Sequence, residues 1–157
     1  MRDIVALLDN DLMYMDHKIN NACIEIQVCS KRDEGICPYC GSPSSRIHST
    51  YERSFQDLPI QGQKVYVTIY NRKYFCDNPQ CSHKTFAESF TCLKPKSKKS
   101  ERLMNEIMKV SLEVSSLTAS RLLRDGVVDV GKSSICNYLK KNNKNIGQGK
   151  RRENMHR

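Results

Sequence analysis

Residues 37–41, Cys-Pro-Tyr-Cys-Gly, and residues 76–81, Cys-Asp-Asn-Pro-Gln-Cys, form two cysteine pairs with 35 residues between Cys40 and Cys76. Gly41 suits a tight turn after the first pair because glycine accepts a positive φ. Asp77-Asn78-Pro79 gives the second pair strong turn chemistry. Each pair therefore predicts a knuckle, and the long segment between them predicts a hairpin or small sheet.

The spacing of the four cysteines points to a metal ion. A structural zinc site has four tetrahedral ligands, with Zn–S distances of about 2.3 Å, and leaves no position for water. We therefore predict one structural, non-catalytic Zn²⁺. Its predicted ligands are Cys37, Cys40, Cys76 and Cys81. The alternatives are disulfides, unrelated buried thiols, and a site in which His48 or His83 replaces one sulfur.

The rest of the composition limits the class of protein. A chain of 157 residues forms one domain or two small ones. The apolar run from Ile4 to Leu8 is too short for a signal peptide, and no segment approaches the roughly 18 apolar residues of a membrane span. We expect a cytoplasmic, nucleoid-associated protein with no membrane partner. The remaining cysteines are expected to be free thiols: Cys23, Cys29, Cys92 and Cys136.

Positive charge is concentrated in the last two-fifths of the chain. Residues 1–93 hold 10 Lys+Arg and 11 Asp+Glu, a balance of −1, and residues 94–157 hold 16 and 6, a balance of +10. Together they give the net charge of +9. This asymmetry indicates a polyanionic partner.

The first 93 residues show mainly strand patterns. We expect a short helix over 4–8, a hairpin of 12–17 with 22–28, a strand over 46–53 and a break over 58–63. The longest strand is predicted over 64–75. Its alternation places Val65, Val67 and Ile69 in the core. The other face would carry Tyr66, Thr68, Tyr70, Arg72 and Tyr74. Such a face more often packs than binds nucleic acid.

Three amphipathic helices are predicted after residue 94. Ser100 can cap the first, whose inner stripe is Leu103, Ile107, Val110 and Val114. Ser116 can cap the second, and Gly126 lies where a left-handed cap is expected. The inner residues of the second helix are Ala119, Leu122 and Leu123. The third helix is predicted from about Lys132 to Asn142, with Ile135 and Leu139 inward.

A tight turn between the second and third helices is typical of a helix-turn-helix unit. The third helix would then enter the major groove of double-stranded DNA, with lysine on phosphates and Ser or Asn on base edges. The predicted DNA-binding residues are Lys132, Ser133, Ser134, Asn137, Lys140 and Lys141. The alternative is a plain three-helix bundle with a solvated lysine face.

Residues 126–133 match the phosphate-loop pattern GxxxxGK[ST]. That pattern has meaning only between a buried strand and a helix. Here a helical stretch precedes it, and three β-branched valines occupy the loop. We therefore expect no nucleotide binding.

The chain resembles transposases of the ISL-three insertion-sequence family. The resemblance covers some two-thirds of the chain, loosely through the helices to about Lys141. It rests on Cys37-Pro-Tyr-Cys-Gly-Ser-Pro-Ser, Arg46-Ile-His-Ser, Asp57-Leu-Pro-Ile, Arg72-Lys-Tyr-Phe-Cys-Asp-Asn-Pro-Gln-Cys and Lys84-Thr-Phe-Ala-Glu88. It implies a zinc ribbon followed by a helix-turn-helix, which in such proteins precede a catalytic domain that cuts and joins DNA.

We expect an α+β protein without that catalytic domain. The expected organisation is an N-terminal hairpin/helix segment (1–31), a zinc-ribbon domain (32–93), a helix-turn-helix domain (94–141) and a disordered basic tail (142–157). The resemblance implies a non-enzymatic transposase fragment that binds terminal inverted repeats, with a second copy or a full-length transposase as further candidate partners. The rivals are a protein-interaction module, an active transposase or nuclease, and a non-functional remnant.

Overall fold

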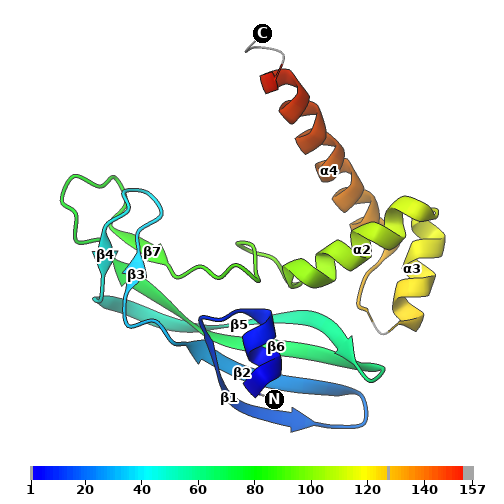
Figure 1. Cartoon of the computed structure of the whole chain (residues 1–157), viewed down its shortest axis with the longest axis horizontal. Coiled ribbons are helices and arrows are strands. Elements are labelled where there is room, and N and C mark those ends of the chain that lie inside the picture. The colour runs from blue at the N-terminus through cyan, green and yellow to red at the C-terminus, as the bar shows by residue number, and fades with distance from the viewer. Residues whose placement is uncertain (1, 127, 154–157) are drawn as a thin grey trace. The chain divides into compact units, whose positions relative to one another are not determined.

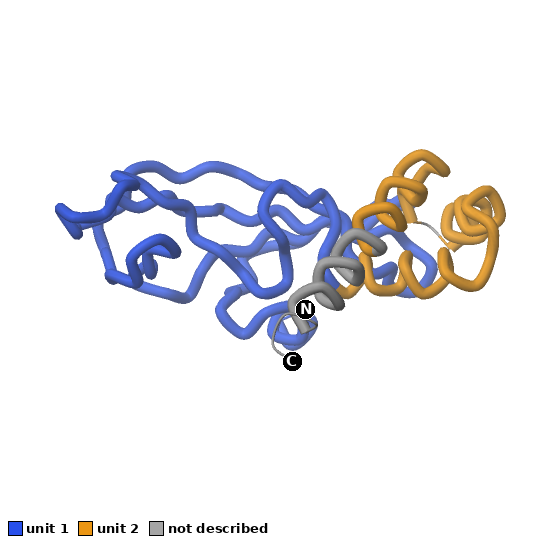
Figure 2. The backbone as a smooth tube through the Cα atoms, turned by 90° about the horizontal axis from the view of Figure 1, so that it is seen from above, with its two compact units in different colours: residues 1–101 blue, residues 102–157 orange. Residues whose placement is uncertain are grey.

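The computed structural model describes residues 2–126 and 128–153, with side chains described as far as residue 142. The chain divides into two compact units, residues 1–101 and 102–157 (Figure 2). Among the described residues, no helix is both long enough and apolar enough to cross a membrane. The mixture of strands and helices gives the α+β class that the sequence predicts.

The first unit is built on one mixed sheet. Its strands have the order β1-β2-β6-β5, and β7 pairs with the far end of β6 (Figure 1). Strands β2 and β6 run parallel, and the other pairs are antiparallel. The elements are α1 (Arg2–Leu8), β1 (Leu12–Ile19), β2 (Cys23–Ser30), β3 (Gly35–Ile36), β4 (Pro43–Ser44), β5 (Ile47–Ile60), β6 (Gln63–Phe75) and β7 (Thr85–Ala87).

The N-terminal hairpin is present as β1 and β2, and α1 precedes it. Because β2 pairs with β6 over seven positions, from Cys23–Lys64 to Cys29–Tyr70, the hairpin belongs to the same sheet as the segment between the cysteine pairs. A polar turn at Asn20 closes the hairpin, where its side-chain Oδ1 accepts the backbone N–H groups of Ala22 and Cys23 at 2.9 Å.

The chain break predicted over 58–63 is present only at 61–62. Strand β5 continues to Ile60, and a two-residue turn, Gln61 (φ 49°) and Gly62 (φ 74°), leads into β6. Positive φ at both central residues matches the twist of a two-residue hairpin. Pro59 is tolerated because the β5–β6 register shifts between Asp57 and Ile60, so no ladder hydrogen bond is required there.

One face of the sheet carries the apolar core of the first unit. Val65, Val67 and Ile69 of β6 are buried in it, as the alternation predicts. Helix α1 and the segment 90–93 pack onto this face. The buried members of the core are Val5, Leu12, Ile24, Ile26, Val28, Phe55, Val65, Val67, Ile69, Phe90, Cys92 and Leu93.

Tyr74 lies on the face of β6 that was predicted to carry tyrosine and arginine. Its alternation places it with Arg72, and the Arg72 Nη1 to Tyr74 hydroxyl distance is 3.4 Å. However, Tyr74 is fully buried because it packs among the metal-site cysteines and Phe86. Alternation alone does not show that a second small core covers this end of β6.

Asp9 joins the end of α1 to the segment that covers the sheet. Its carboxylate accepts hydrogen bonds from the N–H of Asp11 (2.9 Å), the N–H and hydroxyl of Thr91 (2.9 and 2.7 Å) and the N–H of Cys92 (3.3 Å). Burial raises the pKa of Asp9, but these hydrogen bonds outweigh it and hold the pKa below the ordinary 3.8. The Asp9 carboxylate thereby anchors residues 91–92, which are distant from it in the sequence.

Asp9→Asn should lower the free energy of unfolding by roughly 1.5–3 kcal/mol at neutral pH, because hydrogen bonds to a charged acceptor are lost. The lowered pKa means that this contribution is fully present above pH 3.8 and is lost as the pH falls through the folded pKa. Urea unfolding of the wild type and of Asp9→Asn should be compared from acid to neutral pH. The difference between their free energies of unfolding should narrow only in acid. Asp33→Asn is the control: it removes an exposed acid and should change the free energy of unfolding little. If both variants lost the same stability, the Asp9 hydrogen bonds would not be the cause.

The second unit contains α2 (Glu101–Glu113), α3 (Ser116–Asp125) and α4 (Lys132–Glu153). In α2, Leu103 and Ile107 are buried as predicted. In α3, Ala119 and Leu123 are buried, but Leu122 is 53% exposed, so the prediction that it faces inward was wrong. Ser120 lies inward instead, since the buried stripe is centred on Ala119 and Leu123.

The ends of α3 also differ from prediction. Ser115, not Ser116, is the N-cap, and its hydroxyl accepts the N–H of Thr118. Ser116 would need the N–H of Ala119, which already bonds to the Ser115 carbonyl at 2.8 Å. Gly126 has φ −80°, so it is not a left-handed cap. The helix closes without one because Val128 N–H bonds to Leu123 O at 2.9 Å.

Helix α4 extends beyond the expected end of the third helix. It begins at Lys132 as predicted but continues to Glu153, where the sequence favoured a disordered tail over 142–157. Residues 143–153 contain no proline, which would break the helix, although Gly147 and Gly149 each weaken it by roughly 1 kcal/mol. The remaining part of the expected tail, residues 154–157, lies outside the described residues.

Candidate zinc centre and nucleic-acid interface

The first cysteine pair lies in a tight turn between β3 and β4. Gly41 N–H bonds to Cys37 O at 2.8 Å, and Cys37 N–H bonds to Ser42 O at 2.9 Å. Gly41 has φ 75°, the left-handed conformation that its sequence position predicts. The β3–β4 pairing of Gly35 with Ser44 and Ile36 with Pro43 then closes the knuckle.

The second pair lies between β6 and β7. Asn78 organises its turn: its side-chain Oδ1 accepts Gln80 N–H at 2.9 Å, and its carbonyl accepts Cys81 N–H at 3.1 Å. Cys76 N–H bonds to Lys84 O at 2.9 Å, which returns the chain toward β7. The turn chemistry of 77–79 is thus used as predicted.

The four sulfurs converge on one point. All lie within 4.8 Å of one another, and two of the distances are 3.6 Å (Cys40–Cys76) and 4.0 Å (Cys37–Cys81). Four thiolates at about 2.3 Å from one ion are about 3.8 Å apart. A disulfide needs about 2.05 Å, and all eight cysteines are free thiols. The donor set and its spacing fit one structural zinc ion.

The four thiols are not equivalent. Cys37, Cys76 and Cys81 are buried, whereas Cys40 is exposed. Hydrogen bonds from the side chain and backbone of Ser42 lower the pKa of Cys40 to about 6. The pKa of Cys76 is raised to about 12: a backbone hydrogen bond from Asn78 lowers it, but burial and contacts with the other thiols outweigh that bond. The Ser42 hydrogen bonds thus favour the thiolate form of Cys40, the form in which cysteine binds a metal.

Aromatic rings surround the centre. Tyr74 stacks on Phe86 with ring centroids 5.6 Å apart, within the small core of Cys37, Cys76 and Cys81. Neither histidine considered as an alternative ligand belongs to the sulfur cluster. His83 stacks on Tyr39 at 3.4 Å, and His48 contacts Phe75 edge-on at 4.8 Å. The sequence did not predict these ring contacts, because no local pattern shows which aromatic residues of distant segments meet.

Gly35→Ala should destabilise the zinc end of the first unit. A Cβ at residue 35 would lie 2.7 Å from the buried Tyr74 ring, and overpacking costs roughly 1–3 kcal/mol. Urea unfolding of the zinc-loaded protein tests this. Gly131→Ala is the control, since its Cβ would make only an ordinary 3.6 Å contact with Arg124. An unchanged Gly35→Ala midpoint would show that Tyr74 can move at little cost.

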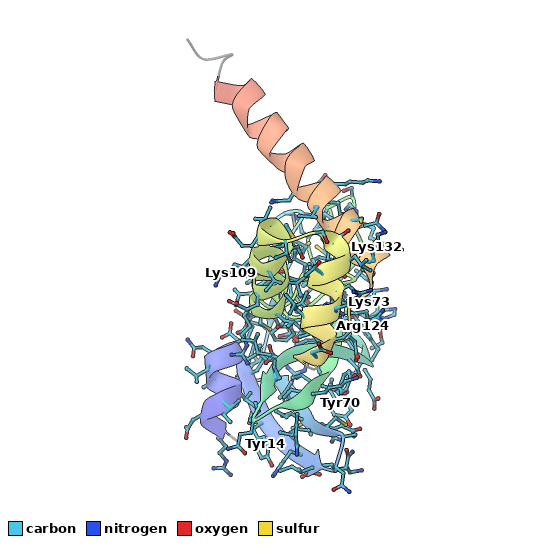
Figure 3. The ribbon with its side chains drawn as sticks, turned by 90° about the vertical axis from the view of Figure 1, so that its right-hand side faces the viewer. Tyr14, Tyr70, Lys73, Lys109, Arg124 and Lys132 are labelled. Atoms are coloured by element: carbon cyan, nitrogen blue, oxygen red, sulfur yellow. The ribbon has the colours of Figure 1, made fainter. Side chains whose placement is uncertain are left out.

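Helix α4 presents most of the predicted DNA-binding residues to solvent. Ile135 is buried and Leu139 is half-buried, as predicted for the inner edge. Figure 3 shows Lys132 where α4 begins. The exposed members of the predicted set are Lys132, Ser133, Asn137, Lys140 and Lys141, and Ser134 is half-buried.

The segment joining α3 to α4 is held by its own residues. Val128 and Val130 are buried, and Val130 O accepts from Arg124 Nε at 3.2 Å and from Ser120 Oγ at 3.4 Å. The phosphate-loop pattern at 126–133 thus follows a helix, not the strand that nucleotide binding requires.

The knuckles and the four-cysteine centre define the first unit as a zinc-ribbon protein. Residues 33–83 match the family described as the zinc-finger of transposase IS204/IS1001/IS1096/IS1165. This match covers about a third of the chain and includes all four cysteines. No curated protein and no solved structure matches the chain. The chain thus carries a zinc ribbon similar to that of these transposases.

Proposed function

We propose that this chain is a zinc-dependent, sequence-specific binder of duplex DNA that recognises the terminal inverted repeats of a transposable element. The observation that carries the proposal is the match of residues 33–83 to a transposase zinc finger. Recognition of DNA ends is the part of transposition that a zinc ribbon and a set of small helices can perform without a catalytic domain.

In this proposal α2, α3 and α4 form a helix-turn-helix unit and α4 is its recognition helix. The support is the exposure of Asn137 and Lys140, one helical turn apart on the face away from buried Ile135. Asparagine can bond bidentately to adenine, and lysine neutralises phosphate. The +10 balance of residues 94–157 would attract the polyanion.

The proposal contains no cleavage step. Transposase chemistry with a metal pair needs carboxylates that converge on two ions. Among the residues that the structure describes, the group found capable of holding a metal is the four-cysteine cluster. The proposed function is therefore DNA binding alone.

A second candidate is a protein-interaction module. The observation that favours it is the exposure of three leucines in the second unit: Leu112 (63%), Leu117 (46%) and Leu122 (53%). Exposed apolar side chains mark protein contacts where they form a contiguous patch. The two candidate functions differ in whether binding depends on the DNA sequence.

The test is zinc content together with selection of the purified chain on a pool of random duplexes at near-physiological salt. One zinc per chain and an enriched DNA sequence would support the proposal. Weak binding that ignores sequence and disappears with added salt would overturn it and favour the interaction module.

A further inference from the structure

A cavity of about 490 Å³ lies on the first unit, bounded by the first knuckle, β5, β7 and the basic segment 94–100. This size falls within the roughly 300–1,000 Å³ typical of small-ligand pockets. Apolar walls come from Phe86, Leu93 and the two prolines Pro38 and Pro95. The cavity is therefore partly apolar and lies beside the basic segment 94–100.

Two tyrosine rings line the cavity, and each is held in place by a neighbour. The Tyr51 hydroxyl accepts a hydrogen bond of 2.7 Å from Nδ2 of buried Asn71, and the Tyr39 ring stacks on His83. Yet Tyr51 is 41% exposed and Tyr39 is 57% exposed. Fixed, exposed aromatic rings are suited to stacking with a flat ligand, because little side-chain freedom is lost on binding.

The charged residues that line the cavity are Arg53, Lys96 and the buried acid Glu88. Arg53 Nη2 donates to the carbonyls of Lys94 and Ser97, which ties the basic segment to β5. Lys96 is exposed, has φ 61° and, among the described residues, forms no ion pair. A non-glycine residue in this conformation costs of order 1 kcal/mol, and such residues occur both in turns and at functional sites.

We propose that this cavity binds an unpaired nucleotide of DNA, with the base against Tyr51 and Tyr39 and its phosphate near Lys96. This inference rests on the proposed function, since it takes DNA as the partner. Stacking on aromatic rings beside a positive groove is how proteins bind single strands without regard to sequence. A base within a duplex is already stacked on both faces, so the cavity selects unpaired DNA. It would thus recognise a frayed or gapped end of the DNA.

The test measures fluorescence anisotropy of the zinc-loaded chain with a labelled oligothymidylate of about eight nucleotides and, separately, with a labelled random duplex. Tyr51→Leu should weaken oligothymidylate binding roughly 5- to 150-fold, the range of one lost stacking contact, and should leave duplex binding unchanged. Tyr51→Phe loses the same hydrogen bond with Asn71 but keeps the ring, and should retain most of the oligothymidylate binding that Tyr51→Leu loses.

Tyr70→Leu is the matched control, because Tyr70 pairs with Glu52 on the opposite face of the sheet from Tyr51. Zinc content and circular dichroism show whether each variant folds. A second experiment does not depend on the folding of Tyr51→Leu. In the wild type, photocrosslinking of a bromouracil oligonucleotide should label Tyr39 or Tyr51. Equal effects of the two leucine variants, or crosslinks confined to other residues, would overturn the inference. Loss of selective duplex binding alone would instead contradict the proposed function.

Discussion

Removal of zinc will unfold the knuckle end of the first unit and leave its long sheet folded. The two ends have separate cores. The small core of Cys37, Tyr74, Cys76, Cys81 and Phe86 surrounds the metal site, whereas the larger core on β2, β5 and β6 contains none of the four ligands. Structural zinc contributes roughly 10–16 kcal/mol of apparent binding free energy at neutral pH, which the knuckles lack without metal.

Hydrogen exchange with and without a chelator measures this directly. The amide of Cys76, bonded to Lys84 O in the second knuckle, should lose its protection. The amides of Val67 and Ile69 in β6 should keep most of theirs, since their side chains lie in the larger core. Cys81→Ser should reproduce the effect of the chelator.

Cys23→Ser serves as the control for this experiment. Cys23 lies at the start of β2, away from the sulfur cluster, so the variant should retain one zinc per chain. If the amides of Val67 and Cys76 lost their protection together on zinc removal, the two cores of the first unit would not be independent. That result would mean that zinc supports the whole first unit.

The features that the sequence predicted are those set by local chemistry. Cysteine spacing and the turn residues Gly41 and Asn78 located the zinc site, because knuckle geometry depends on a few neighbouring residues. The period-two pattern of 64–75 located β6 and its buried face, because pleat alternation is local.

The errors arose where distant segments decide the outcome. Pro59 indicated a break, but it is tolerated in β5, at the edge of the sheet and beside a register shift. The sequence also did not show that Phe86 and the cysteines bury Tyr74 in a second core. The cavity at Tyr51 was not predicted at all, because it needs the segment 94–100 held along β5 through Gln56 N–H to Lys98 O at 2.9 Å. No local pattern contains that information.

Asn137→Ala should remove discrimination between DNA sites, whereas Lys140→Ala should weaken binding to every DNA by a similar factor. An asparagine that bonds an adenine edge contributes roughly 1–3 kcal/mol of discrimination, so the preferred site should bind about 5- to 150-fold more weakly and random DNA little changed. A lysine on phosphate contributes one released counterion, so its loss should lower the slope of log K against log salt by about 1.

Lys109→Ala on α2 is the matched control for charge, since it also removes one exposed lysine from the second unit (Figure 3). Lys109 pairs with Glu106 at 2.6 Å and lies on a helix that the proposal keeps out of the groove. Its loss should change affinity far less than that of Lys140. If all three variants lowered affinity for every sequence alike, Asn137 would not read bases. The second unit would then act only as a positively charged surface, since nonspecific attraction depends on total charge and not on which helix carries it.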